Sequence, residues 1–282
     1  MKKIFLNLIF LLSIHLIMNG QEYKFLTYNI RYDDQKNTET SWSQRKEMLT
    51  AQLRFFDPDI FGTQEGLLNQ LKDIDSVLVN HSFVGAGRDD GKVKGEHSAI
   101  FYNTKKFKMM KNLTFWLSPT PDVVSMGWGS KFNRICTCAL FETVESNKRI
   151  WVFNVHFDHQ AELARENSAK LVIEKIKTLN PDNYPVILMG DFNTEPNTLP
   201  IQYIAGFLND SRAVSIQPPF GNEGTFNGFE FNKPLKSRID YIFISKDNIK
   251  VMKYAVLSDS KNCLYPSDHL PVYVEIKISE NQ

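Results

Sequence analysis

Short segments rich in β-forming residues recur along the whole chain, and several connections between them are too short to hold a helix. A parallel strand pair needs a crossover of about a dozen residues, so short connections favour antiparallel neighbours. Ser98–Tyr102 and Lys108–Leu117 are predicted to form one hairpin, and Arg134–Phe141 and Arg149–His156 a second. The pattern favours mixed, mainly antiparallel sheets with helices outside over a purely parallel, doubly wound fold. The other predicted strands are Tyr23–Ile30, Asp59–Gln64, Val186–Gly190, Ile239–Ser245, Lys250–Leu257 and Val272–Ile278.

Three stretches between these strands are typical of helices. Ser43–Phe55 starts with a serine suited to capping and stops before Asp57-Pro58, Leu67–Leu78 is amphipathic, and Ala161–Leu179 carries apolar residues at helical spacing. No repeat, low-complexity stretch or linker interrupts the chain after its first 20 residues. Residues 21–282 are therefore expected to form one domain.

The first 20 residues are typical of a secretory signal peptide. Lys2 and Lys3 precede an apolar run from Ile4 to Met18, and small or polar residues follow at Asn19 and Gly20. The run is shorter than the roughly 20 apolar residues of a membrane-spanning helix. We therefore expect export to the periplasm or the medium, without a stable membrane anchor.

Charge and cysteine content narrow the class of protein further. Without the first 20 residues, 31 basic side chains face 32 acidic ones, so the net charge is near −1. Nucleic-acid binders usually carry a basic surface, so a dedicated DNA or RNA binder is not favoured. Three cysteines are too few for a disulfide framework. Cys136 and Cys138 alternate along a predicted strand and are expected to be buried. The sequence does not decide whether Cys263 forms a disulfide.

Polar residues stand at the ends of the predicted strands, where a rigid scaffold can bring side chains together. Any one of them alone has an ordinary structural interpretation as a turn residue, a cap or a buried histidine. Their recurrence at strand after strand instead predicts one site. These residues are Asn29, Glu65, His156, Asp158, Asp191, Asn193, Asp240, Asp268 and His269.

The motifs that contain these residues occur in the order TYNIR, TQE, NVHFD, GDFN, RIDYIF and SDHLPV, over nearly the whole chain after residue 20. In this order they resemble the endonuclease/exonuclease/phosphatase superfamily, which has the DNase I-like fold. The resemblance implies an α/β four-layer sandwich, with two mixed, mainly antiparallel sheets packed face to face and helices outside. It also implies a divalent-metal site at one edge. GEHSAIFYN, FWLSPTPD and NRICTCALF look most like a group of exported bacterial hydrolases distantly similar to the deadenylases.

The chemistry of phosphate-ester hydrolysis suggests a role for each residue. Glu65, with Asn29 and Asp268 directly or through water, is the candidate set for Mg²⁺ or Mn²⁺, which prefer oxygen ligands. The resemblance implies that His269 contacts the phosphate or acts as the base while Asp240 orients its ring. The catalytic candidates are His156, Asp191, Asn193, Asp240 and His269, and either Asp191 or His269 can be the base.

Three further residues are candidates for binding substrate. Arg134 offers a guanidinium fork suited to a phosphate, although a surface ion pair explains it equally well. His97 lies beside Glu96 and can line the site or sit in a solvated turn. Asp158 can assist His156 or cap the following helix.

One departure from the family pattern concerns the first motif. DNA-repair members carry an acidic residue where this chain has Arg31, which argues against abasic-site repair. The inositol-polyphosphate 5-phosphatase pattern is also absent around GDFN and SRID.

Taken together, these patterns predict an exported, metal-dependent phosphoric ester hydrolase, monomeric, that uses direct water attack, since no Ser or Cys occupies a nucleophile elbow. The expected substrate is a phosphorylated small molecule, a lipid headgroup or a nucleotide. The alternatives are a secreted nuclease that degrades DNA or RNA and a catalytically silent binding scaffold.

Overall fold

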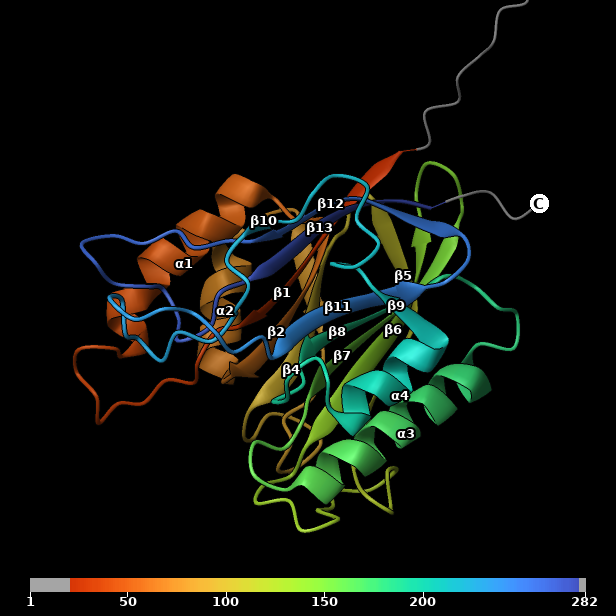
Figure 1. The fold of residues 1–282 in the computed structure, drawn as a ribbon, viewed down its shortest axis with the longest axis horizontal. Coiled ribbons are helices and arrows are strands. Elements are labelled where there is room, and N and C mark those ends of the chain that lie inside the picture. Colours follow the sequence, from red (N-terminus) through yellow and green to blue (C-terminus); the bar gives the residue numbers. More distant parts are fainter. Residues whose placement is uncertain (1–20, 279–282) are drawn as a thin grey trace, which may run out of the picture.

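Two β-sheets lie face to face, and helices cover the outer side of each (Figure 1). The computed structural model describes residues 21–278, so the predicted signal peptide of residues 1–20 lies outside the described residues. The four layers are, in order, the helices α1 and α2, the seven-stranded sheet, the six-stranded sheet, and the helices α3 and α4. The predicted DNase I-like architecture is confirmed.

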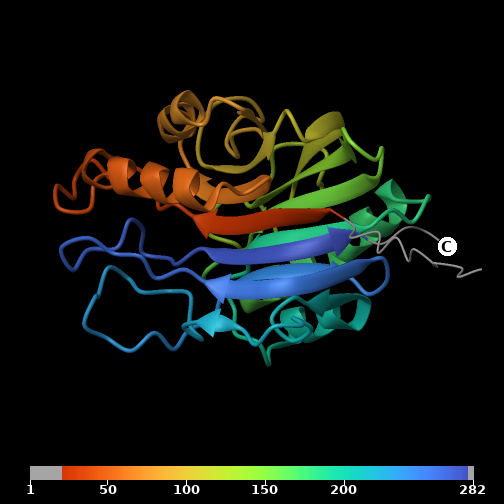
Figure 2. The same cartoon turned by 90° about the horizontal axis from the view of Figure 1, so that it is seen from above.

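The first sheet has the strand order β10-β12-β13-β1-β2-β4-β3, and Figure 2 shows β1, β13 and β12 side by side in it. Its strands are antiparallel except for the parallel pairs β1/β2 and β10/β12. The strand bounds are β1 Glu22–Asn29, β2 Ile60–Gly66, β3 His81–Val84, β4 His97–Asn103, β10 Phe220–Gly221, β12 Ile249–Val256 and β13 Val272–Ile278.

The second sheet has the order β5-β6-β7-β8-β11-β9, in which only β7 and β8 are parallel. Its strands are β5 Phe107–Trp116, β6 Ile135–Thr143, β7 Arg149–His156, β8 Val186–Asp191, β9 Leu208–Asp210 and β11 Asp240–Ser245. The helices are α1 Trp42–Phe56, α2 Leu68–Val77, α3 Glu162–Leu179 and α4 Leu199–Phe207. No described helix has the length and apolarity needed to cross a membrane.

Strand alternation builds three apolar layers from one sequence. In β1, Phe25 faces the space between the sheets, whereas its neighbours Leu26 and Tyr28 pack beneath α1 and α2. A central strand covered on both faces therefore reads as an almost continuous apolar run, as β8 does over residues 186–190. Cys136 and Cys138 are buried together on the face that packs with α3, as predicted.

One predicted hairpin is wrong and the other is confirmed. Strands β6 and β7 pair antiparallel, as expected. Strands β4 and β5, in contrast, lie in different sheets, because β2 and β3 already occupy both edges of β4. The turn after Asn103 therefore carries the chain across the core, where Phe107 packs against Tyr23 and Phe141.

The helix ends follow local signals. Helix α1 begins at Trp42, so Ser43, the expected cap, lies inside its first turn; Ser41 precedes the helix instead, and its side chain makes no capping hydrogen bond. The helix ends at Phe56, and the following Asp57 takes a left-handed conformation before Pro58. Helix α4, which sequence reasoning missed, begins after Thr198 with Pro200 in its first turn, a common helix start.

Candidate active site

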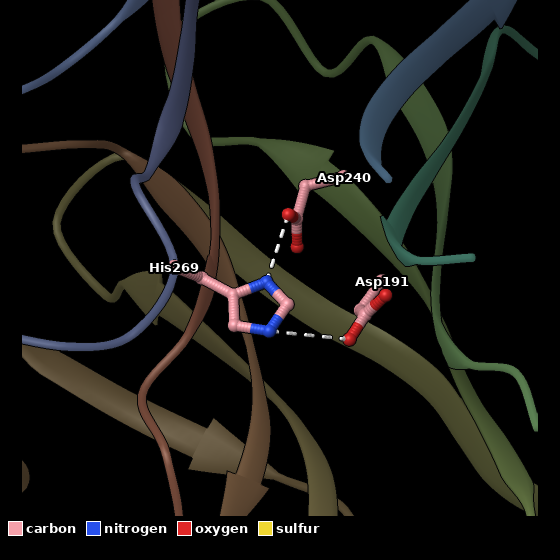
Figure 3. Close-up of side chains that lie close together, drawn as sticks. All are labelled: Asp191, Asp240 and His269. Atoms are coloured by element: carbon pink, nitrogen blue, oxygen red, sulfur yellow. Dashed lines mark hydrogen bonds and ion pairs between the residues drawn. The ribbon is translucent and has the colours of Figure 1, made fainter. Parts of the chain in front are cut away.

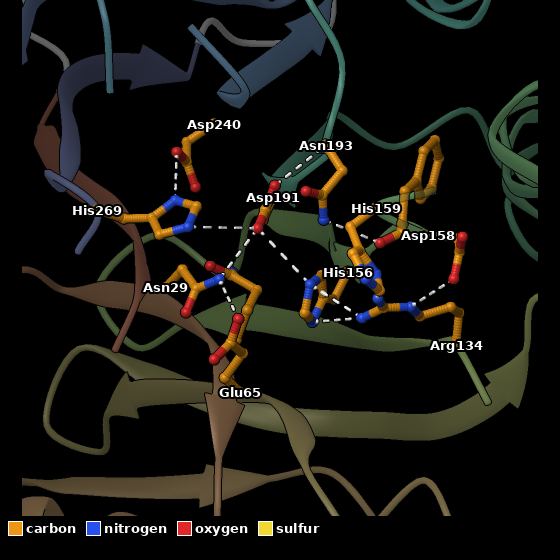
Figure 4. Close-up of polar contacts among 12 residues, drawn as sticks. Asn29, Glu65, Arg134, His156, Asp158, His159, Asp191, Asn193, Asp240 and His269 are labelled. Carbon is orange, nitrogen blue, oxygen red and sulfur yellow. Dashed lines mark hydrogen bonds and ion pairs between the residues drawn. The ribbon is translucent and has the colours of Figure 1, made fainter. Parts of the chain in front are cut away.

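Strand ends from both sheets meet at one edge of the sandwich and place most of the predicted polar residues in or beside a single cleft (Figure 4). In the second sheet, His156 of β7 lies in register with Asp191 of β8, and Asp191 with Asp240 of β11. In the first sheet, Asn29 ends β1 beside the end of β2, which carries Glu65. The cleft has a volume of about 340 Å³.

A β-bulge directs Glu65 into this cleft. The pairing of β2 with β4 shifts between Thr63 and Gly66, and Glu65 adopts a left-handed backbone with φ of 63°. Bulges commonly redirect a side chain beside an active site, and a non-glycine residue in this conformation costs free energy. The strain indicates that the direction of this carboxylate matters more than strand regularity.

Asp240 and His269 form a buried pair that also faces Asp191 (Figure 3). His269 Nδ1 lies 2.9 Å from Asp240 Oδ2, and His269 Nε2 lies 3.8 Å from Asp191 Oδ2. Burial lowers the pKa of His269, but the Asp240 and Asp191 carboxylates outweigh it and raise the pKa well above its ordinary value. Burial, followed by repulsion from Asp240, raises the pKa of Asp191 to about 7. The cluster therefore pairs an imidazolium with a carboxylate poised to exchange a proton near neutral pH.

The last motif is held against the end of β1. Ser267 Oγ donates a hydrogen bond to the Asn29 carbonyl at 2.7 Å, and Asn227 Nδ2 donates to the Ser267 carbonyl at 2.9 Å. Asp268 and His269 follow directly and point into the cleft. Of these two adjacent residues, Asp268 lies on the side of the cleft formed by the first sheet, and His269 pairs with Asp240 of the second sheet.

Glu65, Asn29 and Asp268, the predicted metal ligands, lie together at the side of the cleft formed by the first sheet. Asn29 Nδ2 donates to Glu65 Oε1 at 3.1 Å and to Asp191 Oδ2 at 3.0 Å. The Arg31 guanidinium lies between the two acids, with Nη1 3.6 Å from Glu65 Oε2 and Nε 3.6 Å from Asp268 Oδ2. Two carboxylates that converge on one cation, with an amide beside them, fit a hard divalent ion.

The pKa values of the two acids differ in direction. Burial raises the pKa of Glu65, but Arg31 and other neighbours outweigh it and hold this pKa below its ordinary value. Burial is the largest effect on Asp268 and raises its pKa. Glu65 is therefore the carboxylate held ionised, as a metal ligand must be.

Asp191, Asp240 and His269 also lie close enough to share an ion, since one ligand atom from each falls within 4.8 Å of the others. However, both His269 nitrogens face carboxylates, and the raised pKa keeps the ring protonated. A metal ligand must be a neutral imidazole. We therefore interpret these three residues as an acid–base cluster and the Glu65 side as the metal side.

Arg134 lies in the wall of the cleft with its guanidinium shared among neighbours. Nη1 is 3.0 Å from His156 Nε2, Nη2 is 2.8 Å from His159 Nδ1, and Nε is 3.4 Å from Asp158 Oδ2. Burial and the positive charge of Arg134 lower the pKa of His156 well below its ordinary value. His156 is therefore neutral, and its Nε2 lies 3.6 Å from Asp191 Oδ2.

The structure separates the remaining predicted residues. Asn193 lines the cleft, and its backbone N–H donates to Asp191 Oδ1 at 2.8 Å. Asp158 does not line the cleft; it holds Arg134 and accepts backbone hydrogen bonds just before α3, from Gln160 at 2.9 Å and Ala161 at 2.8 Å. Asp158 thus positions Arg134, which contacts His156, and also binds the backbone just before α3.

His97 is not brought to the cleft. It is buried, and its Nδ1 lies 3.2 Å from the Gly66 carbonyl. Glu96, its neighbour, faces the cleft instead, as expected when successive side chains of extended backbone point to opposite sides. The sequence showed two adjacent residues suited to the site, but it did not determine which of the two faces the cleft.

Sequence reasoning missed several residues of the cleft wall. These are Arg31, Tyr32, Arg88, Glu96, Phe132, His159, Phe226 and Ile239. It also missed the buried Arg45 of α1, which donates to the carbonyls of Ile30 at 2.9 Å, Pro266 at 2.8 Å and Arg31 at 3.0 Å. Arg31, Glu96 and Ile239 lie within motifs quoted above but received no role in the cleft there, and the other residues lie outside the motifs. Only the folded chain brings them together.

Comparison with known proteins gives the same assignment. The model of the Endonuclease/Exonuclease/phosphatase family matches residues 26–269. A solved family protein from Bacteroides thetaiotaomicron is 39% identical, with a TM-score of 0.89 over 93% of this chain and 99% of that chain. A mannosyl-6-phosphatase from the same organism is 40% identical, with a TM-score of 0.86 over 90% of this chain and 99% of that chain.

Curated relatives include an uncharacterized protein of Acanthamoeba polyphaga mimivirus, 33% identical over 56% of this chain and 61% of that protein. They also include the CCR4-Not complex 3′-5′-exoribonuclease subunit of Mycosarcoma maydis, 23% identical over 93% of this chain and 51% of that protein. The chain thus spans about half to three fifths of these relatives. The predicted class, a phosphoric ester hydrolase, is confirmed at the level of the family. By sequence, fold and motif order, the chain belongs to the endonuclease/exonuclease/phosphatase family.

Proposed function

We propose that the protein is an exported, Mg²⁺-dependent phosphoesterase that hydrolyses a phosphomonoester of a small molecule by direct attack of water. The observation that carries the proposal is the buried cluster of Asp191, Asp240 and His269 beside the carboxylates of Glu65 and Asp268. Within residues 21–278, no serine or cysteine lines this cleft, which supports water as the nucleophile.

The roles of the residues follow from their surroundings. Asp191, with a pKa of about 7, accepts the proton of the attacking water, and Asn193 holds Asp191 through its backbone N–H. His269, kept protonated by Asp240, donates a hydrogen bond to a phosphate oxygen. Neutral His156, whose Nε2 lies 3.6 Å from Asp191 Oδ2, donates a hydrogen bond to the negative charge that develops on the phosphate.

Glu65, Asn29 and Asp268 would hold the ion. Bound there, Mg²⁺ would supply positive charge to the phosphate oxygens and the leaving oxygen. Arg31 would leave the two carboxylates when the ion binds, because the guanidinium and the ion compete for the same negative charge.

A sugar phosphate is the proposed substrate. The mannosyl-6-phosphatase is 40% identical over nearly the whole length of both chains, whereas the exoribonuclease is 23% identical. The comparison therefore supports a phosphomonoester substrate more strongly than it supports RNA. The nearly neutral charge of the chain also argues against a polyanionic substrate. A secreted nuclease remains the second candidate because exoribonucleases are among the relatives.

The test is a substrate panel read by mass spectrometry. Purified protein is incubated with Mg²⁺ or with a chelator against sugar phosphates, inositol phosphates, phospholipids, RNA and DNA, beside the His269→Ala variant. Release of inorganic phosphate from a sugar phosphate, lost with the chelator and in the variant, is the expected result. Cleavage of nucleic acid alone would instead establish the nuclease.

Export is tested separately. Cell fractionation and N-terminal sequencing of the mature protein should find it outside the cytoplasm and beginning near Gln21. A cytoplasmic protein that begins at Met1 would contradict this part of the proposal.

A further inference from the structure

One wall of the cleft contains a group of residues that the catalytic roles above leave unused. It consists of Arg88, Glu96 and Phe132, which we call the Glu96 wall. We propose that the Glu96 wall binds the leaving group of the substrate and selects one that is neutral and polyhydroxylated, as a sugar is. This inference rests on the proposed phosphoesterase function and assigns its specificity.

The Glu96 wall begins next to the reacting centre. Glu96 Oε2 lies 3.9 Å from Nδ1 of His156, and Nε2 of the same ring lies 3.6 Å from Asp191 Oδ2. A single imidazole therefore separates the proposed base from Glu96. A leaving group attached to a phosphate at the centre would extend across this short distance and contact the Glu96 wall.

The polar groups of the Glu96 wall retain unused hydrogen-bonding capacity. Arg88 Nη1 donates to Glu96 Oε2 at 2.6 Å, while Glu96 Oε1 has no hydrogen-bond partner among the described residues. Arg88 Nε is buried and makes no hydrogen bond within residues 21–278, although Asp89 Oδ1 lies 3.9 Å away. A carboxylate can accept from two hydroxyl groups, and a guanidinium can donate to their oxygens. Neighbouring sugar hydroxyls, each both donor and acceptor, match this pair.

The charge balance of the Glu96 wall favours a neutral ligand over a second phosphate. Arg88 is paired with Glu96 and has Asp89 Oδ1 3.9 Å from its Nε, while Arg134 is paired with Asp158. Each guanidinium therefore has at least one carboxylate. A second phosphate would have to compete with these carboxylates for either guanidinium.

An exposed aromatic ring completes the Glu96 wall. Phe132 is 42% exposed, and its ring lies 5.0 Å from the Arg88 guanidinium and nearly parallel to His159, at 14°. Small-molecule sites commonly combine an aromatic surface with a few placed polar groups, and the apolar C–H face of a sugar ring suits such a surface.

The backbone holds the Glu96 wall in place before any ligand binds. The Arg88 carbonyl accepts hydrogen bonds from Trp116 Nε1 at 2.8 Å and Asn133 Nδ2 at 3.2 Å. The Arg88 N–H donates to the Glu96 carbonyl at 3.0 Å. A site that is already ordered loses less entropy on binding, so the Glu96 wall is suited to discriminate between ligands.

The experiment compares leaving groups on the same protein. With Mg²⁺ present, kcat/KM is measured for mannose 6-phosphate, for hexyl phosphate, which has no other hydroxyl group, and for adenosine 5′-monophosphate. The variants are Glu96→Gln, which keeps the size of the side chain, and Phe132→Ala, which changes an exposed residue. Glu142→Gln is the matched control, because Glu142 pairs with Arg149 at the opposite end of β6.

We expect the wild-type protein to favour mannose 6-phosphate over hexyl phosphate, and Glu96→Gln to reduce this ratio by about tenfold or more. Phe132→Ala should raise KM for the sugar phosphate, and Glu142→Gln should keep the wild-type ratio. Thermal melting confirms that each variant is folded, and Phe132→Ala keeps the inference testable if Glu96→Gln unfolds.

The outcomes separate this inference from the function on which it rests. Equal losses for sugar and hexyl phosphate in Glu96→Gln would show a structural role and overturn the inference alone. A preference for adenosine 5′-monophosphate that Glu96→Gln abolishes would replace the sugar with a nucleoside and also overturn it. A wild-type protein that hydrolyses no phosphomonoester would overturn the proposed function itself.

Discussion

Replacement of Asp240 with asparagine tests the acid–base cluster most directly. The carboxylate lies 2.9 Å from His269 Nδ1, and both side chains are buried. A hydrogen bond to a charged group contributes about 1.5–3 kcal/mol. Each 1.4 kcal/mol corresponds to about a tenfold change, so Asp240→Asn should lower kcat/KM roughly 10- to 100-fold while the amide keeps the shape of the site.

The pH dependence should change in a defined direction. In the wild-type protein the Asp240 and Asp191 carboxylates, against the effect of burial, hold the pKa of His269 well above its ordinary value, so the ring stays protonated at neutral pH. Without the Asp240 charge this pKa falls, and the imidazolium is lost as the pH rises. The same charge, after burial, raises the pKa of Asp191 to about 7, so that pKa falls too. The whole pH–rate profile of Asp240→Asn should therefore move to lower pH.

The assay measures kcat/KM from pH 5 to pH 10 with excess Mg²⁺, together with the NMR titration of His269 in metal-free protein. Asp59→Asn is the control, because Asp59 is another buried carboxylate that does not line the cleft. It accepts a hydrogen bond from the Lys24 N–H, with a donor–acceptor distance of 2.9 Å. The control variant should lose stability without a shift in the profile. If His269 titrated in Asp240→Asn as it does in the wild-type protein, the reasoning would be refuted.

Three further predictions concern the metal side and the thiols. Glu65→Gln should raise the Mg²⁺ concentration needed for half-maximal activity, because it removes the carboxylate held ionised; an unchanged metal titration would remove Glu65 from the ligands. Arg31→Ala should tighten Mg²⁺ binding several-fold by calorimetry and lower the melting temperature of metal-free protein, since the guanidinium lies 3.6 Å from each of two carboxylates; weaker Mg²⁺ binding would contradict the proposed competition. Cys263, free and exposed, should react with a thiol reagent in the native protein, whereas the two buried cysteines react only after unfolding; reaction of all three at one rate would contradict the packing.

Local sequence patterns were sufficient for most secondary-structure elements. The predicted helix Ala161–Leu179 is observed as Glu162–Leu179, and the predicted strand Arg149–His156 is observed with the same bounds. These signals are short-range, since they depend on alternation, helical spacing and the residues that end each element. The family motifs likewise identified the residues that line the cleft at the strand ends, such as Glu65 and His269.

The partners of each strand were decided only by the tertiary structure. A short connection predicts a hairpin, yet β4 and β5 belong to different sheets because both edges of β4 are taken by strands from elsewhere in the chain. Whether an edge of a strand is free to pair depends on the whole assembled sheet, so a local sequence pattern cannot predict it.

The same distinction applies to the site. The sequence by itself determined that carboxylates, histidines and amides end the strands, and therefore that a phosphate-ester chemistry is available. Only the tertiary structure placed Arg31 between Glu65 and Asp268, and turned Glu96 rather than His97 into the cleft. These choices depend on a β-bulge, on loops joined across the two sheets and on the burial of charge, which are set by packing between residues far apart in the sequence.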